Sequence, residues 1–322
     1  MFSAVQQAGE EITDDKHAEA AARLESALRE DPAMPQARLM LGTAYTELGR
    51  RGEAKAQFDL VLKDDPRSVQ ALIGVANLLM QDGRNEDVVA LCKRTLSLDG
   101  RNTQAYMLLG EVYAGSGRPA EALPAFEKAA EIQPKLTQNR LNLAGALVEL
   151  KQYPRAETLL TEIVHEYPRF PLAQFNLGLL YDEQGRPAEA RVAYEAEVAA
   201  WPRHFRARFN LGKVLFAMGE RRASLEQMRE VVRLAPELPE GHLFLARGLL
   251  HEAGSLDEAQ AEVEKGLSVA RTAELRTLGW LLMADVWTRR GRPDKANEAL
   301  SRARSPAPGS TNTGRVHGTS MD

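Results

Sequence analysis

The sequence predicts an all-α solenoid built from nine helix–turn–helix units, each about 34 residues long. Three observations predict it. Small residues recur every 34 positions, apolar residues recur with helical spacing on both sides of a turn, and proline recurs near the end of each unit. The units start at residues 1, 35, 69, 103, 137, 171, 205, 239 and 277, and the first unit is degenerate.

The first helix of each unit is indicated by positions 4, 7, 8 and 11, whose spacing places them on one face of a helix. Position 8 is small in all nine units, so a neighbouring helix can approach closely there. The residues at position 8 are Ala8, Gly42, Ala76, Gly110, Ala144, Gly178, Gly212, Ala246 and Ala284.

The turn and the second helix are indicated in the same way. Glycine can adopt the left-handed conformation that ends a helix, and it stands at position 15 in seven units. These glycines are Gly49, Gly83, Gly117, Gly185, Gly219, Gly254 and Gly291. In three units, Gly-Arg-Pro places a proline where it can open the second helix, at Pro119, Pro187 and Pro293. Proline also stands at position 32 in seven units, and because it cannot continue a helix, the second helix should end before it.

This 34-residue frame, with Leu at position 7, Tyr or Leu at 11, Ala at 20, an aromatic or apolar residue at 24 and Pro at 32, resembles the tetratricopeptide repeat. The resemblance implies a right-handed superhelix whose first helices line a concave groove, mainly through positions 2, 5, 6, 9, 12 and 13. The departures from the pattern are Gln7 and Glu11 in the first unit, Glu197 at position 27, and Gly266 and Arg271 in the eighth.

Both ends of the array carry polar residues where the pattern expects apolar ones, as at Glu11 and Arg304. A solenoid needs polar outer faces on its terminal units, so we expect a complete array over residues 1–304. Residues 305–322 are rich in Ser, Gly, Thr and Pro and are expected to form a disordered tail. A linker or an expression remnant is the alternative interpretation of this segment.

The composition excludes several classes of protein. The net charge of −4 gives no basic excess, which argues against nucleic-acid binding. The single cysteine, Cys92, stands at core position 24, so it predicts neither a disulfide nor a cysteine zinc site. No apolar run is long enough for membrane insertion. We expect a cytoplasmic protein, or a periplasmic one if the chain is a mature or excised fragment.

No catalytic constellation is found in the sequence, so we expect a protein that is not an enzyme and has no catalytic residue, cofactor or metal site. The informative positions are therefore those that the repeat does not need for packing.

Position 6 is asparagine in three consecutive units, at Asn142, Asn176 and Asn210. An asparagine amide can donate to a peptide carbonyl and accept from a peptide N–H, so three at fixed spacing could hold an extended backbone. The row resembles the asparagine ladder in the repeat region of O-linked N-acetylglucosamine transferases. The alternative is that Asn-Leu-Gly is a common string in such repeats and has no role in binding.

Position 5 is apolar throughout, and its two aromatic residues, Phe175 and Phe209, stand beside Asn176 and Asn210. Aromatic side chains anchor interfaces, so both are candidates for ligand contact, while core packing is the alternative.

Charge at the groove positions changes sign along the array. The acidic side chains of units two to six are Glu47, Glu111, Glu149, Asp182 and Glu183, and the basic side chains of units seven and eight are Arg206, Lys213, Arg247 and His251. One hypothesis is an extended partner that is basic at one end and acidic at the other. The alternative is that these charges are simply solvated.

Glu197 stands where a small residue normally meets the next unit. A buried carboxylate needs a partner, and Arg208, at position 4 of the next unit, is the expected one.

The sequence thus predicts a protein–protein interaction scaffold that binds an extended peptide or a partner protein in the concave groove. The alternatives are a recognition module of a larger enzyme and a structural or oligomerisation platform, although nothing in the sequence indicates an oligomer.

Overall fold

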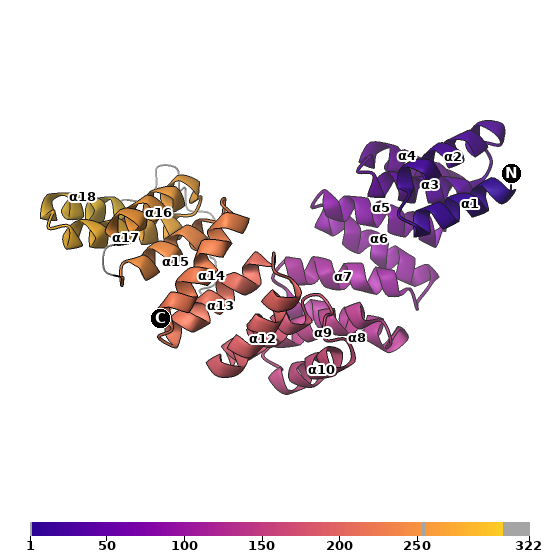
Figure 1. The fold of residues 1–322 in the computed structure, drawn as a ribbon. Helices are drawn as coiled ribbons and strands as arrows, with labels where there is room; N and C mark the ends of the chain where they lie inside the picture. The colour runs from indigo at the N-terminus through magenta and orange to yellow at the C-terminus, as the bar shows by residue number, and fades with distance from the viewer. Residues whose placement is uncertain (1, 253–254, 305–322) are drawn as a thin grey trace. The chain divides into compact units, whose positions relative to one another are not determined.

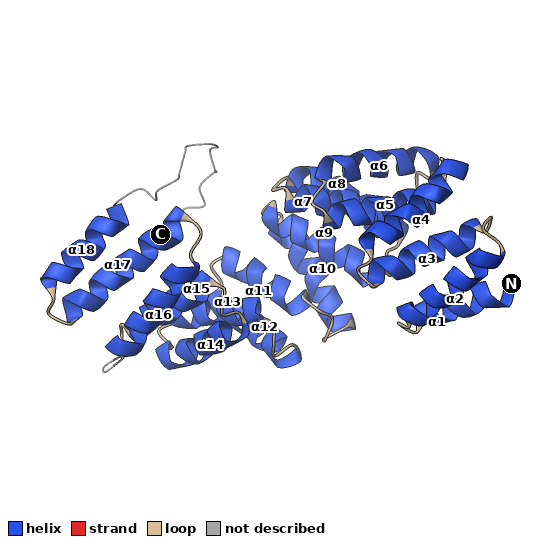
Figure 2. Cartoon of the chain, turned by 90° about the horizontal axis from the view of Figure 1, so that it is seen from above, coloured by secondary structure: helices blue, strands red, loops and turns tan. Residues whose placement is uncertain are grey.

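The computed structural model describes residues 2–252 and 255–304, and within them the chain is helical and without strands (Figures 1 and 2). The expected tail, residues 305–322, and Gly254 lie outside the described residues. The described helices are α1 (Phe2–Thr13), α2 (His17–Glu30), α3 (Pro35–Glu47), α4 (Arg51–Asp64), α5 (Val69–Gln81), α6 (Asn85–Leu98), α7 (Thr103–Gly115), α8 (Pro119–Ile132), α9 (Thr137–Glu149), α10 (Tyr153–Glu166), α11 (Ala173–Glu183), α12 (Pro187–Ala200), α13 (Phe205–Ala217), α14 (Arg221–Leu234), α15 (Pro239–Leu249), α16 (Leu256–Val269), α17 (Ala273–Arg289) and α18 (Pro293–Arg304).

The order of the helices confirms an all-α solenoid, because each expected unit coincides with two successive helices. The chain divides into an N-terminal part, residues 1–163, and a C-terminal part, residues 164–322. From α1 to α9, and again from α11 to α18, each helix packs against the next. First helices also pack against one another, α1 on α3, α3 on α5 and α5 on α7 in the N-terminal part, and α15 on α17 in the C-terminal part.

The turn inside each unit has the left-handed residue that the glycine pattern predicts. In every unit whose turn is described, position 15 has a positive φ, between 57° at Lys151 and 82° at Gly219. Asp15 and Lys151 show that the turn forms even where glycine is missing, at the steric cost that a side chain carries in this conformation. The predicted helix starts are also confirmed, since α8, α12 and α18 begin at Pro119, Pro187 and Pro293.

The two helices of a unit approach closely because a ring at position 24 occupies the space above a glycine at position 8. A β-carbon built on Gly110 would lie 2.4 Å from Cε1 of Phe126, and one on Gly178 would lie 2.4 Å from Cε1 of Tyr194. Phe126 and Tyr194 are 3% and 0% exposed, so neither ring has free space into which it could move. The small-residue pattern therefore reflects direct helix contact.

Cys92, which occupies the same position 24, is fully buried on α6. Burial raises the pKa of its thiol to about 12, so the thiolate that reacts with oxidants and metals is not formed near neutral pH. The interpretation of Cys92 as a packed core residue is confirmed.

A recurring hydrogen bond links consecutive units, and the sequence pattern does not reveal it. The side chain at position 4 donates to the carbonyl six residues earlier, in the loop between units: Arg38 to Pro32 at 2.7 Å and Arg208 to Pro202 at 2.8 Å. Both arginines also donate to a glutamine at position 23 of their own unit, Gln57 or Gln227. Position 4 is thus a polar bridge in these units, not the apolar core position that helical spacing predicts.

This bridge explains why the predicted pairing of Glu197 with Arg208 is wrong. Glu197 is 1% exposed, but its carboxylate meets Nδ1 of His204 at 2.9 Å and accepts the backbone N–H of Phe175 at 3.3 Å. The guanidinium of Arg208 instead bonds Pro202 and Gln227. A buried carboxylate does have a partner here, as expected, but the partner is the imidazole that directly precedes α13.

Candidate functional site

A pocket with a volume of about 580 Å³ opens on the first-helix side of the N-terminal part. It lies over α7, where Gln104, Met107 and Glu111 line it from positions 2, 5 and 9. Its other walls come from α5, from the loops that precede α7 and α9, and from the first turn of α9. The pocket thus occupies the positions that the repeat pattern leaves free of packing.

One wall contains a buried amide with an unused acceptor. Asn139 is fully buried, and its Nδ2 donates to the carbonyl of Ala129 on α8 at 3.0 Å. Its Oδ1 is buried and has no hydrogen-bond partner among the described residues. A buried acceptor left unpaired costs free energy, and a ligand in the pocket could reach this one only if the atoms that cover it moved.

Two acids on first helices of the N-terminal part, Glu111 in this pocket and Glu149 at the end of α9, are exposed, but neighbouring protein atoms partly dehydrate their carboxylates. Desolvation raises the pKa of Glu111, and the hydrogen bond from Nδ2 of Asn142, at 3.5 Å, offsets part of the rise. Desolvation also raises the pKa of Glu149 at position 13 of the next unit. Neither carboxylate has an ion-pair partner among the described residues, so a cation placed beside them would stabilise their charge. One exposed cation, Arg101, lines the rim of the pocket.

The corresponding face of the C-terminal part is aromatic and basic. Phe209 packs edge-on against Phe244, with their ring centroids 5.2 Å apart. Arg247 lies over the ring of Phe216 at 5.5 Å, and His251 contacts the same ring. These groups lie on α13 and α15 and on the residues that follow α15.

Comparison with known proteins agrees with this architecture. Two family models described as tetratricopeptide repeat match the chain, one over residues 11–78 and 113–177 and the other over residues 77–136 and 183–239. The chain belongs to the tetratricopeptide repeat family.

Solved structures of other tetratricopeptide repeat chains show the same fold. The chain is 14% identical to a chain of the Cut9–Hcn1 hetero-tetramer of the APC/C, with a TM-score of 0.63 over 90% of this chain and 53% of that one. The chain therefore spans about half the length of that relative. It is 17% identical, with a TM-score of 0.58, to a tetratricopeptide repeat protein from Parabacteroides merdae, over 83% of this chain and 98% of that one.

A third similar structure is the human IFIT1 dimer with the capped RNA m7Gppp-AAAA, at 17% identity and a TM-score of 0.61, over 92% of this chain and 79% of that one. At these identities the likeness concerns the fold alone. The search of curated proteins finds no match to the chain.

Within this tetratricopeptide repeat array, the three asparagines of position 6 have different surroundings. Oδ1 of Asn142 accepts from Nε2 of Gln138 at 2.7 Å, so this amide already has two protein partners. Asn210 lies near the hydroxyl of Tyr194, which is buried and has no hydrogen-bond partner among the described residues, and burial raises the pKa of this hydroxyl. Asn176 is half-buried. Asn142 lies in the N-terminal part and the other two lie in the C-terminal part.

The two predicted aromatic contacts are partly buried. Phe175 packs against Tyr194 and His204, with ring centroids 6.0 Å and 4.8 Å away, and Phe209 packs against the core beneath α15. Both rings are intermediate in exposure, so each contributes to packing and keeps some surface accessible.

The predicted charged residues of the C-terminal part are accessible. Arg206, Asp182 and Arg247 are exposed, and Lys213 is half-buried. Desolvation raises the pKa of Asp182, the charge of Lys213 lowers it, and Glu183 raises it further. Asp182 and Lys213 therefore act on each other across α11 and α13.

A row of glutamines at position 2 escaped the sequence analysis. Gln36, Gln70, Gln104 and Gln138 occur in four consecutive units, 34 residues apart, and all four are exposed in the first turns of α3, α5, α7 and α9. The signal was available, because it is the same strict 34-residue recurrence that identified the repeat. The four lie together in the N-terminal part, where the asparagine row has only Asn142.

Proposed function

We propose that the chain is a protein–protein interaction scaffold whose first-helix face binds an extended peptide, and that the N-terminal part takes a basic segment of it. One observation carries this proposal. The groove positions of units two to five hold glutamines, asparagines and the acids Glu47, Glu111 and Glu149, but no lysine or arginine.

Exposed glutamine amides suit the peptide backbone, because each can donate and accept a hydrogen bond. The partly dehydrated carboxylate of Glu111 suits a lysine or arginine head group, which donates hydrogen bonds and carries the opposite charge. Met80, Met107 and Leu136 line the same pocket and offer apolar surface to the aliphatic stem of that side chain.

The C-terminal part suits a different segment of the same partner. Phe209, Phe244 and Phe216 offer aromatic surface, and Arg206 and Arg247 are exposed cations beside it. An acidic segment with apolar anchors complements this face. The array proposed for this role spans residues 1–304 and does not include residues 305–322. The same proposal includes that the protein binds its partner without catalysing a reaction and that the protein is cytoplasmic.

The test compares two blocked peptides of about ten residues, long enough to span about 33 Å when extended. One alternates lysine with serine and the other alternates glutamate with serine. Calorimetry should show binding of the lysine peptide, and Glu111→Gln should weaken it about three- to tenfold because a desolvated charge pair is lost. Since the pKa of Glu111 is raised, its charge is lost at a higher pH than for an ordinary glutamate, so the affinity should fall early on acidification.

Glu86→Gln is the matched control, because Glu86 is an exposed acid on α6 and its removal changes the net charge equally. Equal weakening by both substitutions would reduce the effect to net charge and contradict the site. Binding of a capped or uncapped RNA oligonucleotide with higher affinity than the lysine peptide would contradict the peptide assignment itself.

A further inference from the structure

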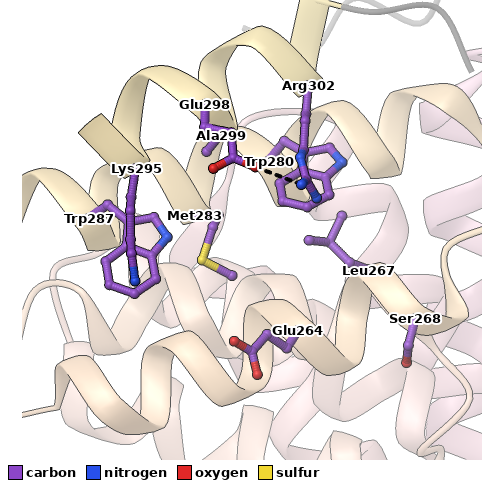
Figure 3. Close-up of a pocket in the computed structure, with 10 residues that line it drawn as sticks. All are labelled: Glu264, Leu267, Ser268, Trp280, Met283, Trp287, Lys295, Glu298, Ala299 and Arg302. Atoms are coloured by element: carbon purple, nitrogen blue, oxygen red, sulfur yellow. Dashed lines mark hydrogen bonds and ion pairs between the residues drawn. The ribbon is translucent and has the colours of Figure 1, made fainter. Parts of the chain in front are cut away.

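A groove of about 510 Å³ runs between α16 and α18, with α17 as its floor (Figure 3). Trp280, Met283 and Trp287 line it from positions 4, 7 and 11 of the ninth unit. By helical geometry these positions face away from positions 5, 9 and 12, which line the first-helix face. The groove is therefore separate from the surface to which the peptide-binding proposal refers.

Two cations from α18 hold the indole rings in place. The guanidinium of Arg302 lies 4.7 Å from the ring centroid of Trp280, and Nζ of Lys295 lies 4.2 Å from that of Trp287. Both contacts are visible in Figure 3, and both are in the range of a cation–π interaction. The two tryptophans are thus ordered without being buried, since each keeps intermediate exposure.

The indole N–H groups supply two donors at a defined spacing. Among the described residues, neither Trp280 nor Trp287 donates a hydrogen bond to another protein group. The two residues are seven apart on one helix, which corresponds to about 10.5 Å along its axis. Met283 and Leu267 contribute apolar surface to the groove between them, and four charged side chains line it as well.

We propose that this groove binds a proline-rich segment of a partner protein in the polyproline II conformation. One turn of that helix has three residues and rises about 9.3 Å, which is close to the axial rise of about 10.5 Å between Trp280 and Trp287 on α17. Its carbonyl groups make no internal hydrogen bonds and can accept from Trp280 and Trp287. Aromatic-lined grooves take such ligands because the extended conformation is preformed and little entropy is lost on binding.

The charges around the groove define what flanks the prolines. Arg302 is paired with Glu298 at 2.7 Å, whereas Lys295 has no carboxylate partner among the described residues. Glu264, on the α16 wall, accepts a hydrogen bond from Gln260 at 2.8 Å. Lys295, at the Trp287 end, and Glu264 thus have no ion-pair partner among the described residues, because the amide of Gln260 is neutral. An acidic residue beside the prolines should therefore lie next to Lys295 and away from Glu264.

The chain contains its own control for a direct test. Its three tryptophans are Trp201, Trp280 and Trp287, and Trp201 lies just after α12, outside the groove. In ¹⁵N spectra of the full chain, the indole signals can be assigned by single Trp→Phe substitutions. A peptide of the type Pro-Pro-Leu-Pro-Pro-Asp-Asp should shift the signals of Trp280 and Trp287 and leave that of Trp201 in place.

Substitutions then separate recognition from folding. Trp280→Phe and Trp287→Phe keep an aromatic ring and remove one donor each, so each should weaken binding about fivefold. Lys295→Glu should weaken the acidic peptide and favour a peptide that ends in Lys-Lys instead. Trp201→Phe should leave the affinity unchanged. An unchanged thermal midpoint in each variant would show that the array is intact.

Several results would overturn the proposal. These are unmoved Trp280 and Trp287 signals at millimolar peptide, equal shifts of all three signals, or equal binding of a control peptide with glycine in place of every proline. Shifts that depend on protein concentration without peptide would assign the groove to a second copy of the chain. Shifts on removal of residues 305–322 would assign it to the chain's own tail. The lysine-peptide experiment is independent of all these outcomes, because it probes a pocket of the N-terminal part.

Discussion

At the scale of single residues, the role of a glycine in a helix depends on which side chains pack against it. Gly110 on α7 and Gly145 on α9 are both in the interior of a first helix, in adjacent units. A β-carbon on Gly110 would lie 2.4 to 2.7 Å from three atoms of the Phe126 ring, whereas a β-carbon on Gly145 would meet nothing within 4 Å. The two glycines therefore have different roles although their helical contexts are similar.

Alanine at the two positions should change stability in opposite directions. Gly110→Ala gains about 1 kcal/mol of helix propensity but forces the buried Phe126 ring to move, at a cost of about 1–3 kcal/mol, so the protein should be destabilised. Gly145→Ala gains the helix propensity without a steric clash, so it should stabilise the protein by up to about 1 kcal/mol. Urea unfolding of both variants measures this. A stabilised Gly110→Ala would contradict the close contact of α7 with α8.

Residue-level predictions succeeded where the reason was local and failed where a partner had to be chosen. Gly219 and Pro187 act through their own backbone conformation, so their roles follow from their positions in the repeat. The partner of Glu197 depends on which of several nearby polar groups already has another hydrogen-bond partner. The sequence alone does not show that Arg208 donates to the carbonyl of Pro202. The unpaired acceptor of Asn139 is a three-dimensional property for the same reason.

At the scale of helices, the hydrogen bond from the side chain at position 4 joins a unit to the loop that precedes it. In the eighth unit His242 has this role. Its Nε2 lies 2.8 Å from the carbonyl of Pro236, and its Nδ1 lies 2.6 Å from Oε2 of Glu262. A carbonyl only accepts hydrogen bonds, so Nε2 must donate. Lys265 donates to the other oxygen of Glu262 at 2.7 Å, which links α15, α16 and the loop between units.

This network predicts a pH-dependent contribution to stability. Burial raises the pKa of Glu262, but the hydrogen bonds and charges of Lys265 and His242 outweigh it and lower the pKa below the ordinary value of 4.5. A carboxyl whose folded-state pKa is depressed stabilises the fold above its unfolded pKa, and this stabilisation is lost as the pH falls through the folded pKa. Glu262→Gln should therefore destabilise the protein at pH 7, and the difference from wild type should shrink below about pH 4.5.

Urea unfolding at several pH values between 7 and 3 measures this difference. Glu264→Gln is the matched control, because Glu264 lies two residues away on the same helix but is exposed, and its substitution should give a difference that varies little with pH. A gap between Glu262→Gln and wild type that stays constant through this range would show that the network does not hold the carboxylate in its charged form.

Helix positions were predictable because periodicity is a local property, and most expected units contain two helices at the expected residues. The longer α17 shows the limit of this reasoning. It begins at Ala273, one turn before the frame start at residue 277, and Arg276 in that turn donates to the carbonyl of Ala270 at 3.1 Å. The extra residues between the eighth and ninth units thus extend a helix, a choice that spacing alone does not determine.

At the scale of the whole molecule, contacts run between neighbours in the chain, as expected of a solenoid. A large hydrophobic core of the N-terminal part is formed by residues between Ala8 and Ala125, and the C-terminal part has clusters of its own around Tyr194 and Leu243. Since each unit packs mainly against its neighbours, the free energy of unfolding should be approximately a sum of terms for single units and for the contacts between adjacent units. Which surface binds a ligand follows from no such rule, which is why the tryptophan groove and the pocket beside Glu111 needed the structure.

If stability resides in contacts between neighbouring units, a fragment of residues 1–168, which ends after α10, should fold by itself. It retains every residue of the core between Ala8 and Ala125 and keeps the ion pair of Arg140 with Glu162, which joins α9 to α10 at 2.9 Å. Circular dichroism should show a helical spectrum and a cooperative thermal transition.

A fragment of residues 1–150 is the control, because it removes α10 with the fully buried Leu160 and leaves α9 without its second helix. It should melt at a lower temperature, by several degrees for each kcal/mol of lost packing. If the 1–168 fragment were unfolded, stability could not reside in local contacts between neighbouring units, and the N-terminal part would depend on residues beyond 168.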